Sequence, residues 1–229
     1  MKIAVMQPYF FPYIAYWQLI NAVDTFVIYD DVSYIKGGYI NRNSLLGNSN
    51  SQLVTLELIG ASSNKQINQI KIADNSQKIL KTISQNYSKA PFFEDFFPVL
   101  VKLLSNKEKK LSRFIGNSLI VISQYLNVDT NFVYSSDICN DKQLNSQARL
   151  IEISKLLNAN YYVNSIGGTK LYNKDIFSEN DINLRFIKSD PISYKQFDNS
   201  FVPNLSIIDV IMFNSIDDIK LMLNRYDLI

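Results

Sequence analysis

Short apolar runs alternate with amphipathic stretches along the chain, and the first of them predict a β-α-β unit. Residues 3–6 form a β-prone apolar run that ends before Pro8, and residues 12–23 carry apolar positions at loose helical spacing. We interpret residues 25–29, TFVIY, as a strand of the type buried on both faces. We therefore expect the loops after both strands to face the same space, at the carboxyl edge of a parallel sheet where ligands bind.

The rest of the chain extends this pattern. Further strands are predicted at 52–58, 131–135, 161–165 and 183–188, and helices at 76–87, 91–104, 109–127, 142–159, 175–177 and 205–213, the last as a terminal helix. Phenylalanines in the second of these helices are interpreted as core residues. The predicted architecture is an α/β fold with a mainly parallel, Rossmann-like sheet under covering helices. It carries a helical insertion at about 75–127 within a single domain, 1–229.

Composition narrows the chemistry of this fold. With 23 Lys and Arg against 21 Asp and Glu, the chain has a net charge of +2 and no basic footprint for DNA. Cys139 is the single cysteine, which excludes an internal disulfide framework. The chain has no histidine, so Ser-His-Asp and Cys-His nucleophiles and His metal ligands are excluded. No signal-like start and no long apolar run is present, so we expect a cytoplasmic protein without a membrane span.

Three groups of residues are candidates for a site, and each has a plain structural alternative. The turn after the first strand offers Gln7, Pro8, Tyr9 and Tyr13, which either shape a pocket or plug the sheet edge. The second strand is followed by Asp30, Asp31, Lys36, Tyr39, Asn41, Arg42 and Asn43, which either bind a ligand or form a solvated loop.

The third group is the glycine loop after the strand at 161–165. Ser165, Gly167 and Gly168 either let the backbone approach an anion or form an ordinary turn. The spacing is not that of a Walker loop. In residues 204–209 we interpret Ser206 as a helix cap that Asp209 completes, which is a structural role.

The segment MQPYFFPYIAYWQLINAVDTFVIYDDVSYIKGGYINRN strongly resembles the opening signature of the WbqC-like proteins. The resemblance continues through APFFEDFFPVL, ARLIEISKLLNANYYVNSIGG and FVPNLSIIDVIMFNS, and so covers nearly the whole chain. Two departures stand out: the family usually has KRGW where this chain has Lys36-Gly37-Gly38-Tyr39, and a common SG is here Asn164-Ser165.

The resemblance implies a cytoplasmic enzyme of surface-polysaccharide or O-antigen synthesis. Its expected reaction is transfer of an acyl or aminoacyl group to the amine of a nucleotide-linked amino sugar, so the implied partners are that sugar and an acyl or aminoacyl donor. A fainter resemblance to nucleotidyltransferases and pantothenate-synthetase-like ligases lies in the strand, proline turn and helix. Because the H-x-G-H pair of those enzymes is absent here, histidine-dependent adenylyl transfer ranks lower.

Roles for the candidate residues follow from this chemistry. Asp30 or Asp31 takes the proton of the amine. Gln7, Asn41 and Asn43 hold sugar hydroxyls or the oxyanion, the tyrosines stack on a base or sugar, and Lys36 and Arg42 pair with a diphosphate. The sequence assigns no cofactor and no metal ligands. Two alternatives stay open: a nucleotide-dependent ligase or nucleotidyltransferase, and a non-catalytic sugar-nucleotide-binding partner.

Overall fold

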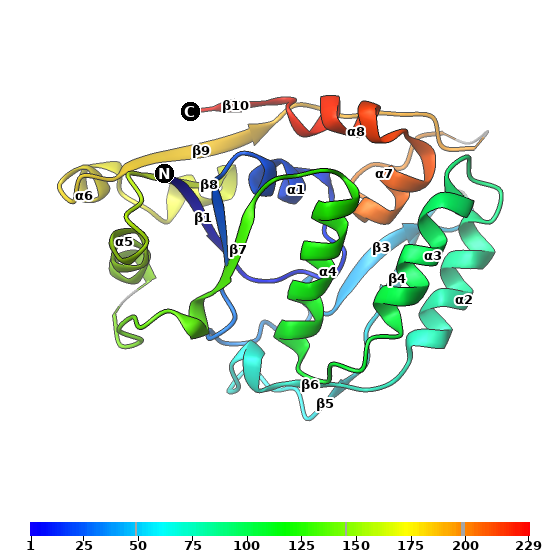
Figure 1. Cartoon of the computed structure of the whole chain (residues 1–229), viewed down its shortest axis with the longest axis horizontal. Coiled ribbons are helices and arrows are strands. Elements are labelled where there is room, and N and C mark those ends of the chain that lie inside the picture. The colour runs from blue at the N-terminus through cyan, green and yellow to red at the C-terminus, as the bar shows by residue number, and fades with distance from the viewer. Residues whose placement is uncertain (49, 145, 198–199) are drawn as a thin grey trace.

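A computed structural model describes residues 1–48, 50–144, 146–197 and 200–229 of the chain (Figure 1). The strands are β1 (Lys2–Met6), β2 (Thr25–Ile28), β3 (Arg42–Leu46), β4 (Ser51–Thr55), β5 (Leu58–Ile59), β6 (Lys71–Ile72), β7 (Asn131–Tyr134), β8 (Tyr161–Ser165), β9 (Asn183–Ser189) and β10 (Tyr226–Leu228). The α-helices are α1 (Ile14–Asn21), α2 (Ser76–Tyr87), α3 (Phe93–Leu104), α4 (Leu111–Tyr125), α5 (Ser146–Leu156), α6 (Lys174–Ser178), α7 (Ile207–Phe213) and α8 (Ile216–Leu223). Three 3₁₀ turns join them, η1 (Ile67–Gln69), η2 (Ser135–Asp137) and η3 (Ile166–Lys170).

The predicted parallel sheet is present, and its strand order creates a switch point. The order is β10-β9-β8-β1-β2-β7, and β10 runs antiparallel to β9 whereas the other pairs are parallel. From β1 the chain passes outward through β2 to β7 and then crosses back to β8 on the other side of β1. The carboxyl edges of β1 and β8 therefore border the crevice in which open α/β sheets bind ligands.

Both faces of the sheet are covered, which explains the continuous apolar runs in β1 and β2. Ala4, Phe26 and Ile28 join a buried cluster with α1 to α4, α7 and α8. Ile3 and Val27 point to the opposite face and join a second cluster with α5 and α6. Successive residues of a strand face opposite sides, so a strand buried on both faces needs apolar residues throughout.

The helical middle is found as predicted, and it packs on the sheet through the first of these clusters. Helix α2 spans the predicted 76–87, and α3 and α4 begin two residues inside their predicted ranges. In Figure 1, α2 and α3 stand side by side, and α4 lies on the other side of α3. The predicted helix 142–159 is found as α5, and residue 145 within that range lies outside the described residues.

Three expectations about elements were wrong. The strand predicted at 52–58 is two strands, β4 and β5, which pair with β3 and β6 in separate two-stranded ribbons outside the main sheet. Strand β3 lies partly in residues predicted as loop. The helix at 205–213 is not terminal, because α8 and β10 follow it and β10 completes the sheet edge. No helix in the described part of the chain is long and apolar enough to cross a membrane.

Candidate functional site

A cleft of about 740 Å³ opens at the switch point. Its floor is formed by the carboxyl ends of β1, β8 and β9, one wall by the turn before α1 and the first turns of α1, and the other wall by residues of the segments 190–194 and 201–205. The volume lies within the range of small-molecule sites, roughly 300–1,000 Å³. The cleft is lined by, among others, Tyr9, Tyr13, Ala15, Ser165, Lys188 and Tyr194.

The turn from β1 to α1 is held in place through its own carbonyl groups. Tyr16 Oη donates to the carbonyl of Gln7 at 2.8 Å, and Trp17 Nε1 donates to that of Pro12 at 3.0 Å. Asn43 Nδ2 donates to the carbonyls of Phe10 and Phe11 at 3.1 and 2.9 Å. The backbone of this turn is therefore fixed before any ligand arrives.

Tyrosine rings form the wall that this turn presents to the cleft. The ring centroid of Tyr9 lies 5.4 Å from that of Tyr16 and 6.2 Å from that of Tyr39. Burial raises the pKa of Tyr9 above its usual value, with smaller contributions from Tyr13 and Tyr39. The pKa of Tyr13 is also raised, by burial and then by Tyr39. These phenols stay protonated at neutral pH, so each offers a ring face together with an O–H donor.

The glycine loop contributes Ser165 and Ile166 to the cleft but not its glycines. Ser165 lies at the end of β8 and lines the cleft, whereas Gly167 and Gly168 do not. Gly168 is buried, and a methyl group added to it would lie 3.2 Å from atoms of Asn164, Phe186 and Tyr172. A side chain at this position would therefore require these three neighbouring side chains to shift by a few tenths of an ångström. Gly167 is exposed, and a methyl group added to it would make an ordinary van der Waals contact with Ser165 Oγ at 3.9 Å.

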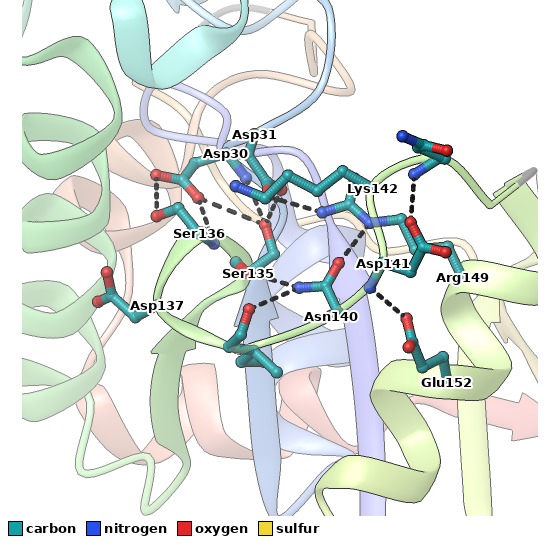
Figure 2. A network of polar contacts seen from close by, with 12 residues as sticks. Asp30, Asp31, Ser135, Ser136, Asp137, Asn140, Asp141, Lys142, Arg149 and Glu152 are labelled. Atoms are coloured by element: carbon teal, nitrogen blue, oxygen red, sulfur yellow. Dashed lines mark hydrogen bonds and ion pairs between the residues drawn. The ribbon is translucent and has the colours of Figure 1, made fainter.

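Asp30 and Asp31 lie outside the lining of the cleft, in a polar network between the ends of β2 and β7 (Figure 2). Asp30 accepts from the backbone and hydroxyl of Ser136, both at 3.1 Å. Asp31 Oδ1 accepts from Ser135 Oγ at 2.5 Å, and its Oδ2 accepts from Arg149 Nη2 at 2.7 Å. Both aspartate side chains are buried, and so is Arg149.

The residues around Asp31 lower the pKa of its carboxyl group. Burial by itself would raise the pKa of this carboxyl, but the hydrogen bond from Ser135 and the charge and hydrogen bond of Arg149 outweigh burial, and the pKa is lowered. Lys142 Nζ, 3.4 Å away, acts in the same direction. A carboxylate with a lowered pKa is a weak base at neutral pH.

The segment after Asp30 and Asp31 contacts the turn before α1 through Tyr39, in addition to the hydrogen bonds that Asn43 donates there. The carbonyl of Tyr39 accepts from Phe10 N–H at 3.1 Å, which places the Tyr39 ring beside that of Tyr9. Asn41 is occupied within the loop, since it accepts from Tyr34 Oη at 2.8 Å and donates to Leu56 O at 2.9 Å.

The cationic residues of this loop also lie outside the cleft lining. Arg42 donates through Nε to Gly38 O at 3.1 Å and through Nη2 to Gly37 O, and Lys36 is exposed. Gly37 has φ of +80°, a left-handed conformation that favours glycine at this turn. The ligand-binding roles of Lys36 and Arg42 stay predictions.

The structure thus unites two of the three predicted groups only in part. Tyr9, Tyr13 and Ser165 meet in the cleft, whereas Gln7 and Pro8 lie beside it in the same turn. The wall formed by residues of 190–194 and 201–205 was missed, because neither segment has a periodic pattern and residues 204–209 were interpreted only as the start of a helix. The available signal was its position directly after β9, at the same edge of the sheet.

The proposed capping role at the start of α7 was half right. Ser206 Oγ caps the helix by accepting from Ile208 N–H at 3.2 Å. Asp209 does not complete a capping box, because the backbone N–H of Ser206 donates to Ser44 O at 2.8 Å instead. The carboxyl group of Asp209 is directed toward other partners, described below. Among the described residues, no group of three or more Cys, Asp or Glu side chains is arranged to hold a metal ion.

Sheet topology and cleft together define an α/β protein of Rossmann-like architecture with its candidate ligand site at the switch point between β1 and β8. The chain belongs to the WbqC-like protein family, whose sequence profile matches residues 7–221. It is also 27% identical over 218 residues to the uncharacterized protein Rv1507c of Mycobacterium tuberculosis, a match that covers 93% of each chain. No solved structure matches the chain significantly.

Proposed function

We propose that this chain is an enzyme of surface-polysaccharide synthesis that transfers an acyl or aminoacyl group to the amine of a nucleotide-linked amino sugar bound in the cleft. The observation that carries the proposal is the tyrosine-walled cleft at the switch point. Its rings suit the faces of a nucleobase or sugar, which bind on aromatic side chains. The family resemblance supports the choice of a sugar nucleotide over other nucleotides.

The start of α1 suits the diphosphate of such a ligand. Tyr13, Ile14 and Ala15 line the cleft there, and α1 has neither a side-chain cap nor an acidic residue in its first turn. The amino end of a helix carries a partial positive charge and N–H groups that bind anions. Lys188, near the end of β9, places a positive charge among the lining residues, and Asp190, just after β9, places a negative charge there.

The reaction that we propose forms a C–N bond, breaks the C–S or C–O bond of the donor, and moves one proton from the nitrogen to the leaving group. The lone pair of the neutral sugar amine attacks the carbonyl carbon of a thioester or ester donor and forms the C–N bond. The bond from that carbon to sulfur or oxygen then breaks, the leaving thiolate or alkoxide takes the electron pair, and it binds the proton that the nitrogen loses as the amide forms. The phenol and hydroxyl donors of the cleft, which include Tyr9, Tyr13 and Ser165, supply hydrogen bonds to the oxyanion of the intermediate.

Calorimetric titration with UDP-linked and dTDP-linked amino sugars, and with ATP, tests the proposal. Ala15→Phe places a ring in the cleft at a helical position and is expected to weaken binding of the amino-sugar nucleotide at least tenfold, an effect of about 1.4 kcal/mol. Ala61→Phe is the matched control, because Ala61 is exposed and outside the lining. Lys36→Ala tests the predicted diphosphate contact of the loop in the same experiment.

The outcomes separate the candidate functions. Binding that Ala15→Phe removes, together with a mass increase of the sugar nucleotide on adding an acyl thioester, supports the transferase. Binding of ATP alone would favour the ligase. Binding without product from any thioester or ester donor would favour the non-catalytic partner, and equal binding by the wild type and Ala15→Phe would contradict the site.

A further inference from the structure

One buried carboxyl group touches a residue of the cleft wall. Tyr194 lines the cleft, and its Oη donates to Asp209 Oδ1 at 2.5 Å. Asp209 lies in the first turn of α7 and has no exposed surface. The distance is at the short end of the range for a hydroxyl bound to a carboxylate, about 2.5–2.7 Å.

Three neutral side chains donate hydrogen bonds to this carboxyl group. Gln196 Nε2 donates to the same Oδ1 at 2.6 Å, and Tyr87 Oη, from α2, donates to Oδ2 at 3.0 Å. Tyr87 in turn accepts from Leu46 N–H of β3 at 2.7 Å. The titratable groups that face Asp209 are therefore Tyr87 and Tyr194, and no lysine or arginine of the described chain forms an ion pair with it.

Asp209 differs in this respect from the acidic pair at the end of β2. Burial raises the pKa of Asp209, and the hydrogen bonds from Tyr194, Gln196 and Tyr87 offset that effect only in part. Asp31 is also buried, but its guanidinium partner lowers its pKa. A buried carboxylate without a cationic partner binds a proton more readily than one in an ion pair.

We propose that Tyr194 and Asp209 form the proton-accepting pair of the cleft, with Tyr194 as the group that contacts the amine and Asp209 as its positioning residue. The inference rests on the proposed function and identifies the acceptor of its first proton. One proton passes from the bound ammonium nitrogen to Tyr194 Oη while the phenolic proton passes to Asp209 Oδ1. The ammonium becomes an amine, the carboxylate becomes a carboxylic acid, and the phenol is restored. Asp30 or Asp31 acting as the base is the competing prediction.

Infrared difference spectroscopy on adding a UDP-linked amino sugar at neutral pH tests the transfer directly. In the wild type we expect the band of a protonated carboxylic acid to appear on binding, and we expect it to be absent in Asp209→Asn. Tyr194→Phe retains Asp209 but lacks the hydroxyl, so the band should be absent there too. The matched sugar nucleotide with a hydroxyl in place of the amine should produce no band in any variant.

Several results would overturn the proposal that Tyr194 and Asp209 accept the proton. Binding without the band in the wild type would do so, and so would a band of full size in Tyr194→Phe or in Asp209→Asn. A band that disappears in Asp31→Asn while it persists in Asp209→Asn would assign the proton to the acidic pair instead. Tyr194→Phe lies in a half-buried position, so it keeps the test available if Asp209→Asn fails to fold.

A titration of the free protein keeps this inference separate from the proposed function. Carbon-13 NMR of labelled aspartate carboxyl groups follows Asp209 without any ligand. We expect Asp209 to bind its proton more tightly than an ordinary aspartate, and Tyr194→Phe to tighten proton binding a further tenfold or so, because a donor to the charged form is lost. If no amino-sugar nucleotide binds, the proposed function fails, and this titration alone decides the pair. An Asp209 that titrates at or below the ordinary range would overturn it.

Discussion

Arg149 supplies the buried positive charge beside the acidic pair, Asp30 and Asp31. Its guanidinium group binds Asp31 at 2.7 Å and the side-chain oxygen of Asn140 at 2.7 Å, and it lies over the ring of Tyr29, 4.9 Å from the centroid. Both partners of the ion pair are buried, so bulk water does not solvate either charge. Removing one partner leaves the other charge buried and uncompensated, which costs more than the pair itself contributes.

Arg149→Met is therefore expected to lower the free energy of unfolding at pH 7 by about 3 kcal/mol or more. Lys142→Met is the control: Lys142 is 3.4 Å from the same oxygen but half-exposed, and its loss should cost less than about 1 kcal/mol. Urea unfolding measures both. Equal losses in the two variants would contradict the assignment of Arg149 as the main partner.

The stabilisation by this ion pair is expected to depend on pH. Because the folded state lowers the pKa of Asp31, the stabilisation is present above the ordinary aspartate pKa of about 3.9 and is lost as the pH falls through the lowered value. The difference between wild type and Arg149→Met should accordingly shrink below about pH 4. A difference that stays constant down to pH 2 or so would place its origin in packing rather than charge.

At this scale the sequence locates strand-end residues but not their partners. Tyr9, Tyr13 and Ser165 could be predicted to meet because each follows a strand of one parallel sheet. Arg149 could not be predicted, since it lies 118 residues from Asp31 on a helix of its own. Asp209 was missed for a different reason: a helix start explains an aspartate three residues after a serine, so nothing in the sequence called for a second role.

Among the elements, α4 and β7 fit together at one glycine. Gly116 lies within α4, and a methyl group at this position would collide with the phenol group of Tyr134, the last residue of β7. The guanidinium of Arg113, one turn earlier on α4, lies 3.8 Å from the centroid of the same ring. The tyrosine is thus held between the helix backbone and a cation.

Gly116→Ala is expected to destabilise the protein by about 1–2 kcal/mol, since overpacking outweighs the gain in helix propensity of about 1 kcal/mol. Gly167→Ala, where the added methyl group makes only an ordinary contact with Ser165 Oγ, should change stability by less than about 0.5 kcal/mol. Thermal and urea unfolding measure both changes. If the collision with Tyr134 is the cause, the penalty disappears in a Tyr134→Ala background. If Gly116→Ala is still destabilising in the Tyr134→Ala background, the collision with Tyr134 is not the cause.

Helices and strands were predicted accurately where the spacing of apolar residues was regular. Helices α2, α3 and α4 have apolar residues at helical spacing over 12 to 15 residues, and each was predicted within two or three residues. Strand β10 has three residues and β3 begins with Arg-Asn-Ser, so neither carries a clear apolar signal. These strands form because neighbouring strands offer them hydrogen bonds, which the local sequence does not reveal.

For the molecule as a whole, the position of the cleft follows from the connection that crosses back over β1. The chain completes β1, β2 and β7 before it returns to β8, so the loops after β1 and β8 diverge and leave space between them. The strand alternation predicted this class of sheet, but strand order depends on long-range pairing that the sequence did not define. The order decides that the cleft lies toward β8 and β9 and away from the acidic pair at β2 and β7.

Methyl NMR of isoleucine-labelled protein, recorded with and without a UDP-linked or dTDP-linked amino sugar, tests this location most directly. Ile14, Ile166 and Ile187 line the cleft from α1, η3 and β9, whereas Ile138 and Ile151 lie on the side of the acidic pair. We predict that the methyl signals of the first three shift on binding and that those of the other two stay in place. Shifts confined to Ile138 and Ile151 would contradict the account and move the site to Asp30 and Asp31.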